Sequence, residues 1–205
     1  MREASVSTEL FERRSVDVRL GGRYSLANRR DMQGNRREFA CRTSRVSPFQ
    51  MMISVPVLGA IGERVVSYFG EFGKLDGWVS QHVDNGFLID LAVPKEKRAQ
   101  LAGKLSWLEK RQKETVIDAR TQERIVPENP HSTLIFADGS TLGCFVIDMS
   151  VTGAAVSADV QPAIGAPLAV GRSVGRVVRH FAEGFAVKFE RPVDRDYLEH
   201  LIIKT

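Results

Sequence analysis

Hydrophobic and polar residues alternate along short runs of this chain, and glycine or proline ends most of the runs. The run at 133–136 leads into Asp138-Gly139, a pair that favours a tight hairpin turn, and a second run at 142–149 follows it. Further runs at 167–170, 175–179 and 184–189 are each bounded by glycine or proline. Short strands at this spacing predict a mostly β protein, either a sandwich or a small antiparallel barrel.

Two segments instead have helical spacing. Residues 94–112 begin with proline in the first turn and place Leu101, Leu105 and Leu108 on one face. Residues 194–203 carry apolar positions behind an acidic first turn, which suits the helix dipole. Between the first helix and the next strand, residues 113–131 are polar and contain two prolines, so we expect a loop or linker there.

The strand pattern occurs twice. Cys41 precedes Ser47 by six residues, as Cys144 precedes Ser150, and an Ile-Gly pair follows each serine after 14 residues. Farther along, Gly77 and Gly175 each stand nine residues before a Gly-Phe pair. Several coincidences in one register predict a duplicated β domain. We therefore expect two small β domains, each a sandwich or an antiparallel barrel, at 11–91 and 113–205, joined by a helix at 92–112, with a short C-terminal helix.

Charge separates the two copies. The 205 residues hold 29 Lys+Arg against 25 Asp+Glu, but residues 1–50 hold 11 against 6. The basic surplus therefore belongs to the first quarter of the chain, where it could meet nucleic acid or an acidic partner. Nucleic acid ranks last among the expected partners, because the basic segment lacks the interleaved aromatic residues of a single-strand reader.

Several function classes do not fit the sequence. No apolar run is long enough to span a bilayer, and the charged N-terminus lacks a signal-peptide core, so we expect a cytoplasmic protein without membrane insertion. Two cysteines 103 residues apart do not form a disulfide framework or a zinc ribbon, and the four histidines lack metal-ligand spacing. No G-x-S-x-G elbow is present, so we expect no enzymatic activity. We also expect no bound metal or cofactor.

The second copy carries two short motifs. Asp148, Ser150 and Gly153 form a D-x-S-x-x-G at the end of a strand, and Arg120 and Arg124 form an R-x-x-x-R upstream. Each motif alone is weak, since other R-x-x-x-R spacings occur in the chain. In this order, and followed by glycine-broken strands, they are far more specific.

With these residues the chain resembles the PilZ family, bacterial receptors for the second messenger cyclic di-GMP. That family folds as a six-stranded antiparallel barrel with a C-terminal helix, so the resemblance implies a mostly β chain of two small antiparallel β-barrels joined by a helix and linker. The resemblance covers about 115–205 with the full motif and extends to 11–91 as a degenerate copy. It implies a cyclic di-GMP site at five residues: Arg120, Arg124, Asp148, Ser150 and Gly153.

The chemistry of these residue types agrees with that ligand. A guanidinium group can fork onto phosphate oxygens or guanine O6 and N7, and it can stack on a purine. Asp148 could accept from a guanine edge or hold an arginine, Ser150 offers a small donor, and Gly153 lets backbone approach the ligand. Arg176 and Arg179, on a neighbouring strand, could add phosphate contacts. Ligand would then draw the linker onto the barrel.

The first copy departs from the motif. A constant offset of 103 aligns Asp148, Ser150 and Gly153 with Arg45, Ser47 and Gln50. The same offset aligns Arg120 and Arg124 with Asp17 and Gly21. We therefore expect the first barrel to be structural or to bind a partner.

Three functions follow as hypotheses. The first is a cyclic di-GMP receptor that changes its interdomain arrangement and signals to a protein partner, with motility, polysaccharide synthesis or attachment as the outputs that the resemblance implies. The second is a ligand-independent interaction adaptor built on two barrels, and the third is a nucleic-acid binder using the basic first quarter. One or two ligands per site, and a homodimer formed through the helix, stay open.

Overall fold

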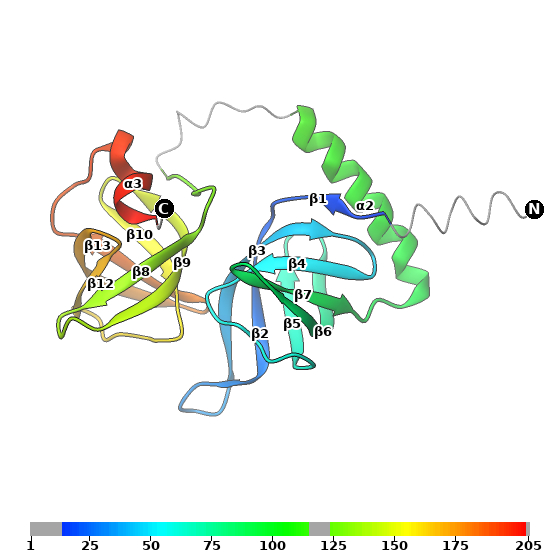
Figure 1. Cartoon of the computed structure of the whole chain (residues 1–205), viewed down its shortest axis with the longest axis horizontal. Helices are drawn as coiled ribbons and strands as arrows, with labels where there is room; N and C mark the ends of the chain where they lie inside the picture. The colour runs from blue at the N-terminus through cyan, green and yellow to red at the C-terminus, as the bar shows by residue number, and fades with distance from the viewer. Residues whose placement is uncertain (1–13, 115–123, 204–205) are drawn as a thin grey trace, which may run out of the picture. The chain divides into compact units, whose positions relative to one another are not determined.

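The computed structural model describes residues 14–114 and 124–203, which form two compact, mostly β units before and after segment 115–123 (Figure 1). Among the described residues, no helix combines the length and the apolar character that crossing a bilayer requires. Each unit is a closed ring of six antiparallel strands, as the sequence predicts.

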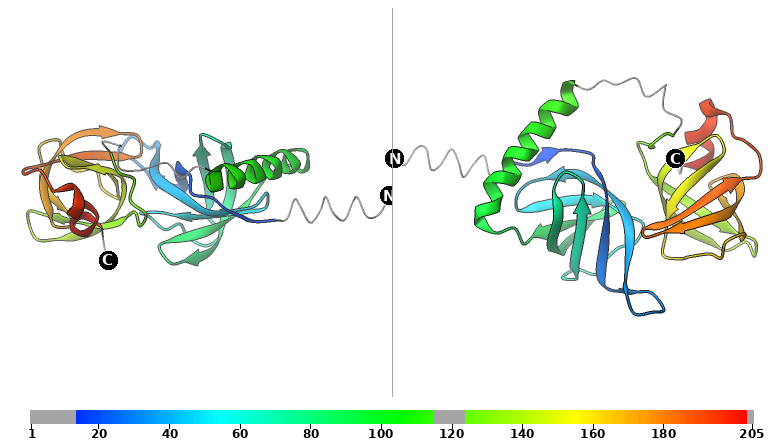
Figure 2. Two further views of the ribbon diagram at one scale, coloured as in Figure 1. Left: turned by 90° about the horizontal axis from the view of Figure 1, so that it is seen from above. Right: turned by 180° about the vertical axis from the view of Figure 1, so that it is seen from behind.

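The first unit closes in the order β3-β2-β5-β6-β7-β4, with β4 returning to β3. Its strands are β2 (Gly21–Arg30), β3 (Arg36–Val46), β4 (Gln50–Ser54), β5 (Arg64–Phe69), β6 (Gly73–Val83) and β7 (Gly86–Leu91). A short β1 (Val16–Asp17) pairs with the end of β3. The long helix α2 (Lys95–Glu114) follows β7 and lies beside these strands (Figure 2, right). It buries the predicted leucine face, with Leu105 almost fully covered.

The second unit closes in the order β10-β13-β12-β11-β8-β9. Its strands are β8 (His131–Phe136), β9 (Thr141–Ser150), β10 (Gly153–Ser157), β11 (Pro167–Val170), β12 (Ser173–Phe181) and β13 (Gly184–Phe189). A short C-terminal helix is present, but the expected continuous helix over 194–203 is divided into two parts. Asp194 accepts a hydrogen bond from the Asp196 backbone N–H and caps a 3-10 turn, η2 (Arg195–Tyr197), before α3 (Leu198–Ile202) begins. Leu198 and Ile202 then pack into the barrel core.

The two rings repeat each other strand for strand, since β2 to β7 are joined in the same order as β8 to β13. Both rings have a β-bulge at the equivalent position, after Val79 in the first ring and after Val177 in the second. His82 Nε2 lies 2.7 Å from the Gly59 carbonyl oxygen, and His180 Nε2 lies 2.7 Å from that of Pro162. This histidine pair extends the repeat that the glycines indicate in the sequence.

The repeated glycines are needed where strands approach closely. A Cβ on Gly86 would lie 1.9 Å from the Ile53 carbonyl oxygen, and one on Gly184 would lie 2.1 Å from that of Val156. The repeated cysteines share a buried position in β3 and β9. Burial raises the pKa of the Cys41 thiol and raises the pKa of Cys144 to about 12, so both are neutral structural side chains.

Candidate functional site

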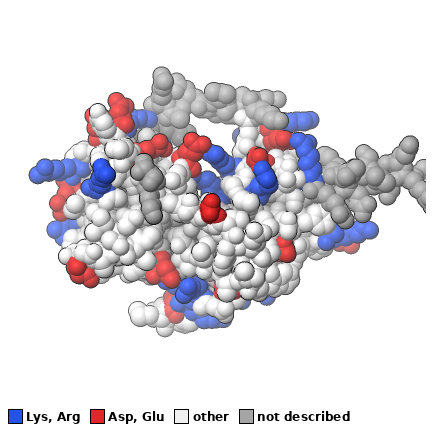
Figure 3. Space-filling model, in the orientation of Figure 1, with Lys and Arg blue, Asp and Glu red and all other residues white. Residues whose placement is uncertain are grey.

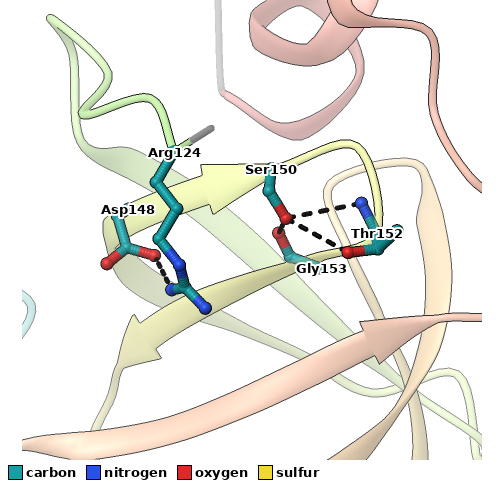
Figure 4. Close-up of polar contacts among 5 residues, drawn as sticks. All are labelled: Arg124, Asp148, Ser150, Thr152 and Gly153. Carbon is teal, nitrogen blue, oxygen red and sulfur yellow. Dashed lines mark hydrogen bonds and ion pairs between the residues drawn. The ribbon is translucent and has the colours of Figure 1, made fainter. Parts of the chain in front are cut away.

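The motif residues of the second copy lie on the β9–β10 hairpin. Met149 points into the barrel core, and because strand residues alternate between faces, Asp148 and Ser150 point outward. Gly153 begins β10 directly opposite Ser150. Figure 4 shows these side chains on the outer surface of the hairpin.

Arg124 reaches this hairpin from the segment before β8. Its Nη1 donates to Asp148 Oδ1 at 2.5 Å. The next residue, Ile125, exchanges two backbone hydrogen bonds with Met149, at 2.7 and 2.8 Å, which anchors the chain beside β9. The Arg124 side chain is 58% exposed and that of Asp148 25%, so the guanidinium is oriented yet open to solvent.

Ser150 shapes the turn. Its Oγ accepts from the Thr152 backbone N–H at 3.4 Å, donates to the Gly153 carbonyl oxygen at 3.4 Å, and lies 3.3 Å from Thr152 Oγ1. These contacts close the two-residue connection between β9 and β10. The serine therefore has a structural task in addition to the donor role expected from the motif.

Gly153 has a different reason to be glycine than the sequence suggests. A Cβ there would lie 2.4 Å from the Val187 carbonyl oxygen on β13. The close packing of β10 against β13 is enough to require glycine at this position. Its absence of a side chain also keeps the outer surface low beside Ser150.

The additional arginines lie two strands from β10, on β12. The register places Asp148, Ala155, Ala186 and Arg179 in one row across β9, β10, β13 and β12. The adjacent row holds Ser150, Gly153, Lys188 and Arg176. Three strand spacings separate the ends of each row by about 14 Å along the surface.

The small residues Gly153, Ala155 and Ala186 lie in the register between the β9 polar residues and the β12 arginines, and they are called the floor here. Ala155 is itself buried. Arg176 is already engaged, since it donates to the Gly165 carbonyl oxygen at 3.3 Å and lies 3.7 Å from Glu190. Arg179 lies over the Phe181 ring at 5.8 Å. Lys188, at the edge of the floor, was missed by sequence reasoning, although the outward position of Lys188 in the alternating run 184–189 could have indicated it.

Arg120 lies outside the described residues, so the structure brings together one arginine of the R-x-x-x-R with the D-x-S-x-x-G. Within residues 14–114 and 124–203, no three His, Cys, Asp or Glu side chains gather closely enough to hold a metal ion. The site as described is a surface of oriented cations, one carboxylate and a low floor. Such a surface can bind a planar, anionic molecule by hydrogen bonds and stacking.

The corresponding hairpin of the first copy carries the opposite arrangement of charge. Asp17 on β1 pairs with Arg45 on β3 at 2.8 Å, and both side chains are largely exposed. The hydrogen bond from Arg45 and its positive charge hold the pKa of the Asp17 carboxyl below its usual value. Ser47 keeps the turn role of Ser150, since its Oγ accepts from the Gln50 backbone N–H at 3.0 Å.

The comparisons with known proteins bear on the second unit. The PilZ domain family model matches residues 118–204. The second unit therefore matches a PilZ domain. PilZ domains are receptor modules without catalytic activity, in agreement with the expectation that this chain is not an enzyme.

Three solved structures are similar to almost the whole chain. PlzA of Borreliella burgdorferi, solved in complex with c-di-GMP, is 13% identical, with 98% of this chain and 97% of that chain covered and a TM-score of 0.31. The Bacillus subtilis inhibitor of motility, MotI/DgrA, is 11% identical, with 91% and 93% covered and a TM-score of 0.30. YcgR of Escherichia coli, in complex with c-di-GMP, is 12% identical, with 88% and 80% covered and a TM-score of 0.25. No curated protein matches the chain.

Proposed function

We propose that this chain is a receptor for cyclic di-GMP, bound by its PilZ domain at Arg120, Arg124, Asp148, Ser150 and Gly153. The observation that carries the proposal is the Arg124–Asp148 pair on the β9–β10 hairpin of the PilZ domain. The pair fixes an exposed guanidinium above a turn that Ser150 closes. This order of residues is the one that the family motif requires.

The ligand explains why the pair is on the surface rather than buried. Cyclic di-GMP offers two phosphates and two guanine bases, so it needs planar cations that are oriented before it arrives. Asp148 holds Arg124 through one carboxylate oxygen, and a carboxylate has further lone pairs for the N–H groups of a guanine edge. An arginine held in this way loses less side-chain entropy on binding than a solvated one.

The floor of Gly153, Ala155 and Ala186 supports the same proposal. A purine ring needs a flat surface without protruding side chains. In the strand register Ala155 and Ala186 lie between Asp148 and Arg179, and Gly153 lies beside them in the adjacent row. Arg176 and Arg179 would contact phosphate from the β12 side, and Lys188 would add a cation at the edge of the floor. The spacing of about 14 Å leaves room for a dinucleotide between the two sides.

Binding would also act on the segment that contains Arg120. That arginine precedes the second barrel, whereas Asp148 and Ser150 belong to the barrel itself. A ligand that contacts both favours the arrangement in which the segment lies on the hairpin. The resulting change between the two units is the output by which we propose that the receptor signals to a protein partner in the cytoplasm.

Isothermal titration calorimetry of the full chain with cyclic di-GMP tests the site. We expect Arg124→Ala and Asp148→Ala each to weaken binding by about 30-fold, because charge-assisted hydrogen bonds contribute about 2 kcal/mol. Arg45→Ala is the matched control, since it breaks the corresponding pair of the first unit, and it should change the affinity by less than twofold.

Two results would count against the proposal in different ways. Undiminished affinity in both Arg124→Ala and Asp148→Ala would contradict the site. No heat from the wild-type chain at high nucleotide concentration would contradict the receptor function and favour the ligand-independent adaptor.

A further inference from the structure

A hollow lies between α2 and the β5–β6 turn of the first unit. Its volume is about 430 Å³, within the range of about 300 to 1,000 Å³ that small-molecule pockets occupy. Its lining residues come from β6 and the turn before it, from the segment 92–94 and from α2, so all of them belong to the first unit. Figure 2 shows α2 alongside the strands of this barrel. The hollow contains none of the motif residues.

The base of the hollow is apolar. Leu75 on β6, Val93 after β7 and Leu101 on α2 line it, and all three are buried. Phe72 in the turn adds an aromatic wall, and its ring packs edge-on against that of Phe69, with centroids 6.0 Å apart. Water that covers such side chains is released when an apolar group takes its place, which favours the binding of an apolar ligand body.

The rim of the hollow carries lysines. Lys97, Gln100 and Lys104 are spaced at i, i+3 and i+7 on α2, so they lie on one face of the helix. Lys74 lines the opposite side, on β6. In Figure 3, blue atoms of Lys and Arg lie along the side of the first unit that carries α2.

One acidic side chain lines the hollow among the residues that the structure describes, and it is already paired. Asp76 Oδ1 accepts from Arg64 Nη2 at 2.9 Å, and Lys74 Nζ lies 3.2 Å from Asp76 Oδ2. Burial raises the pKa of the Asp76 carboxyl, but the hydrogen bonds and charges of Arg64 and Lys74 outweigh it and hold the pKa below its usual value. This carboxylate therefore does not compensate the lysines of α2.

The two α2 lysines keep N–H groups that have no acceptor. Lys104 Nζ donates to the Glu71 carbonyl oxygen at 3.1 Å, and an ammonium group has three donors. Lys97 Nζ makes no hydrogen bond or ion pair within residues 14–114 and 124–203. The Glu71 side chain does not line the hollow. The rim therefore presents positive charge above an apolar base.

The matching place in the second copy is nearly closed. The β11–β12 turn corresponds to the β5–β6 turn, and a helix follows the last strand in both copies. The Arg172 backbone N–H donates to the Leu201 carbonyl oxygen of α3 at 2.7 Å, and a Cβ on Gly171 would lie 2.4 Å from the same oxygen. The space left there is about 180 Å³. In the first copy the long Lys104 side chain makes the hydrogen bond from helix to turn, which leaves the hollow open.

We propose that this hollow binds a small amphipathic carboxylate, a molecule with an apolar body and one anionic head group. The body would lie on the buried base, and the head group would accept from Lys97, Gln100 and Lys104. A nucleotide fits less well, because the side chains of the base offer no hydrogen bonds to a nucleobase and Asp76 in the wall would repel a second negative charge. The proposal concerns the first unit and does not depend on the cyclic di-GMP site.

Isothermal titration calorimetry of the full chain with octanoate, and with octan-1-ol as the uncharged analogue, tests the proposal. We expect octanoate to bind with a dissociation constant below about 1 mM, which its roughly ten non-hydrogen atoms can supply. Octan-1-ol should bind about tenfold more weakly, because it lacks the charge-assisted hydrogen bonds of the head group. Lys97→Gln/Lys104→Gln should weaken octanoate binding about tenfold and leave octan-1-ol binding unchanged, since it removes the cations and keeps the apolar base.

Ala92→Phe tests the position of the ligand from the apolar side. Ala92 is exposed and lines the hollow, and its backbone N–H donates to the Asp76 carbonyl oxygen at 2.8 Å. A phenyl group at this position would fill part of the hollow while the backbone keeps its hydrogen bond. Octanoate and octan-1-ol should therefore both bind about tenfold more weakly to this variant.

The matched control is Lys95→Gln/Lys110→Gln, which removes two exposed lysines of α2 that do not line the hollow. It should change octanoate affinity by less than about twofold, because exposed charges at a distance are screened by salt. Equal losses in the two lysine pairs, equal affinities for octanoate and octan-1-ol, or no heat from the wild-type chain at several millimolar octanoate would overturn the proposal. Tighter binding of pentaglutamate than of octanoate would also overturn it and would indicate an acidic protein segment as the occupant.

Discussion

The outer surfaces of the two barrels differ far more than their frames. In the second copy one row of the sheet runs Asp148, Ala155, Ala186, Arg179. In the first copy the corresponding row runs Arg45, Met52, Leu88, Gln81. Bulky residues stand where the second copy has alanine, and the two charged ends are replaced or lost. The frame repeats, but the surface that could hold a planar ligand exists in one copy.

The adjacent row shows the same difference. Gln50 replaces Gly153, and its amide donates to Asp90 at 2.8 Å, while Asp90 stands in the register position of Lys188. Trp78 takes the position of Arg176. An oriented ion pair is kept beside the turn in both copies, but its polarity is reversed. We infer that the hairpin accepts an ion pair of either polarity, whereas the proposed ligand site needs one particular polarity.

The largest expected effect comes from substituting the glycines at which the strands of each barrel approach closely. A Cβ introduced by Gly86→Val would lie 1.9 Å from the Ile53 carbonyl oxygen, and one introduced by Gly184→Val would lie 2.1 Å from that of Val156. Overpacking against backbone cannot be relieved by a rotamer change, so each should destabilise its own barrel by about 3 kcal/mol. Urea unfolding followed by circular dichroism measures both units, and tryptophan fluorescence reports on the first, which holds Trp78 and Trp107.

Gly143→Ala is the control, because a Cβ there meets nothing within 4 Å. It should change the free energy of unfolding by less than about 0.5 kcal/mol. If Gly86→Val were tolerated while Gly184→Val was not, the two frames would not be equivalent.

Reversing the polarity of one pair separates structure from ligand binding. Arg124→Asp/Asp148→Arg gives the second copy the charge order of Asp17 and Arg45. An exposed pair contributes little to folding, so the free energy of unfolding should change by less than about 1 kcal/mol. Calorimetry should show cyclic di-GMP binding weakened about 100-fold, since the carboxylate now faces phosphate. Binding within threefold of wild type would show that polarity does not matter.

These comparisons also show what the sequence can predict. Repeated glycines and the alternating pattern were enough for a duplicated β domain, because close strand contacts require glycine and outward faces require polar residues. The resemblance to a known family then favoured barrels over sandwiches. The sequence placed Asp148 and Ser150 at the end of a strand, and the structure adds that both point outward from it. The Asp17–Arg45 pair was not predicted, although the constant offset named both residues.

The reason lies in the segment that precedes each barrel. The offset of 103 holds for β3 and β9, but it aligns Asp17 with Arg120. In the structure Val16 pairs with Val46 as Ile125 pairs with Met149, so the leading segments correspond with an offset of 109. A connecting segment can gain or lose residues without changing the barrel. Its register is therefore set by backbone hydrogen bonds that no local pattern reveals.

The smallest expected effect concerns the floor alone. Ala186→Leu gives the second copy the residue that stands at Leu88 in the first, on the outer face of β13. The change adds a side chain where we propose that a purine lies, while Arg124 and Asp148 keep their pair. Calorimetry should show cyclic di-GMP bound about tenfold more weakly, or about 1.4 kcal/mol. Leu88→Ala, the reverse change in the first copy, should create no site, because Arg45 keeps the wrong polarity. Unchanged affinity in Ala186→Leu would contradict the floor as part of the site and would place the ligand at Arg124 and the β9–β10 hairpin instead.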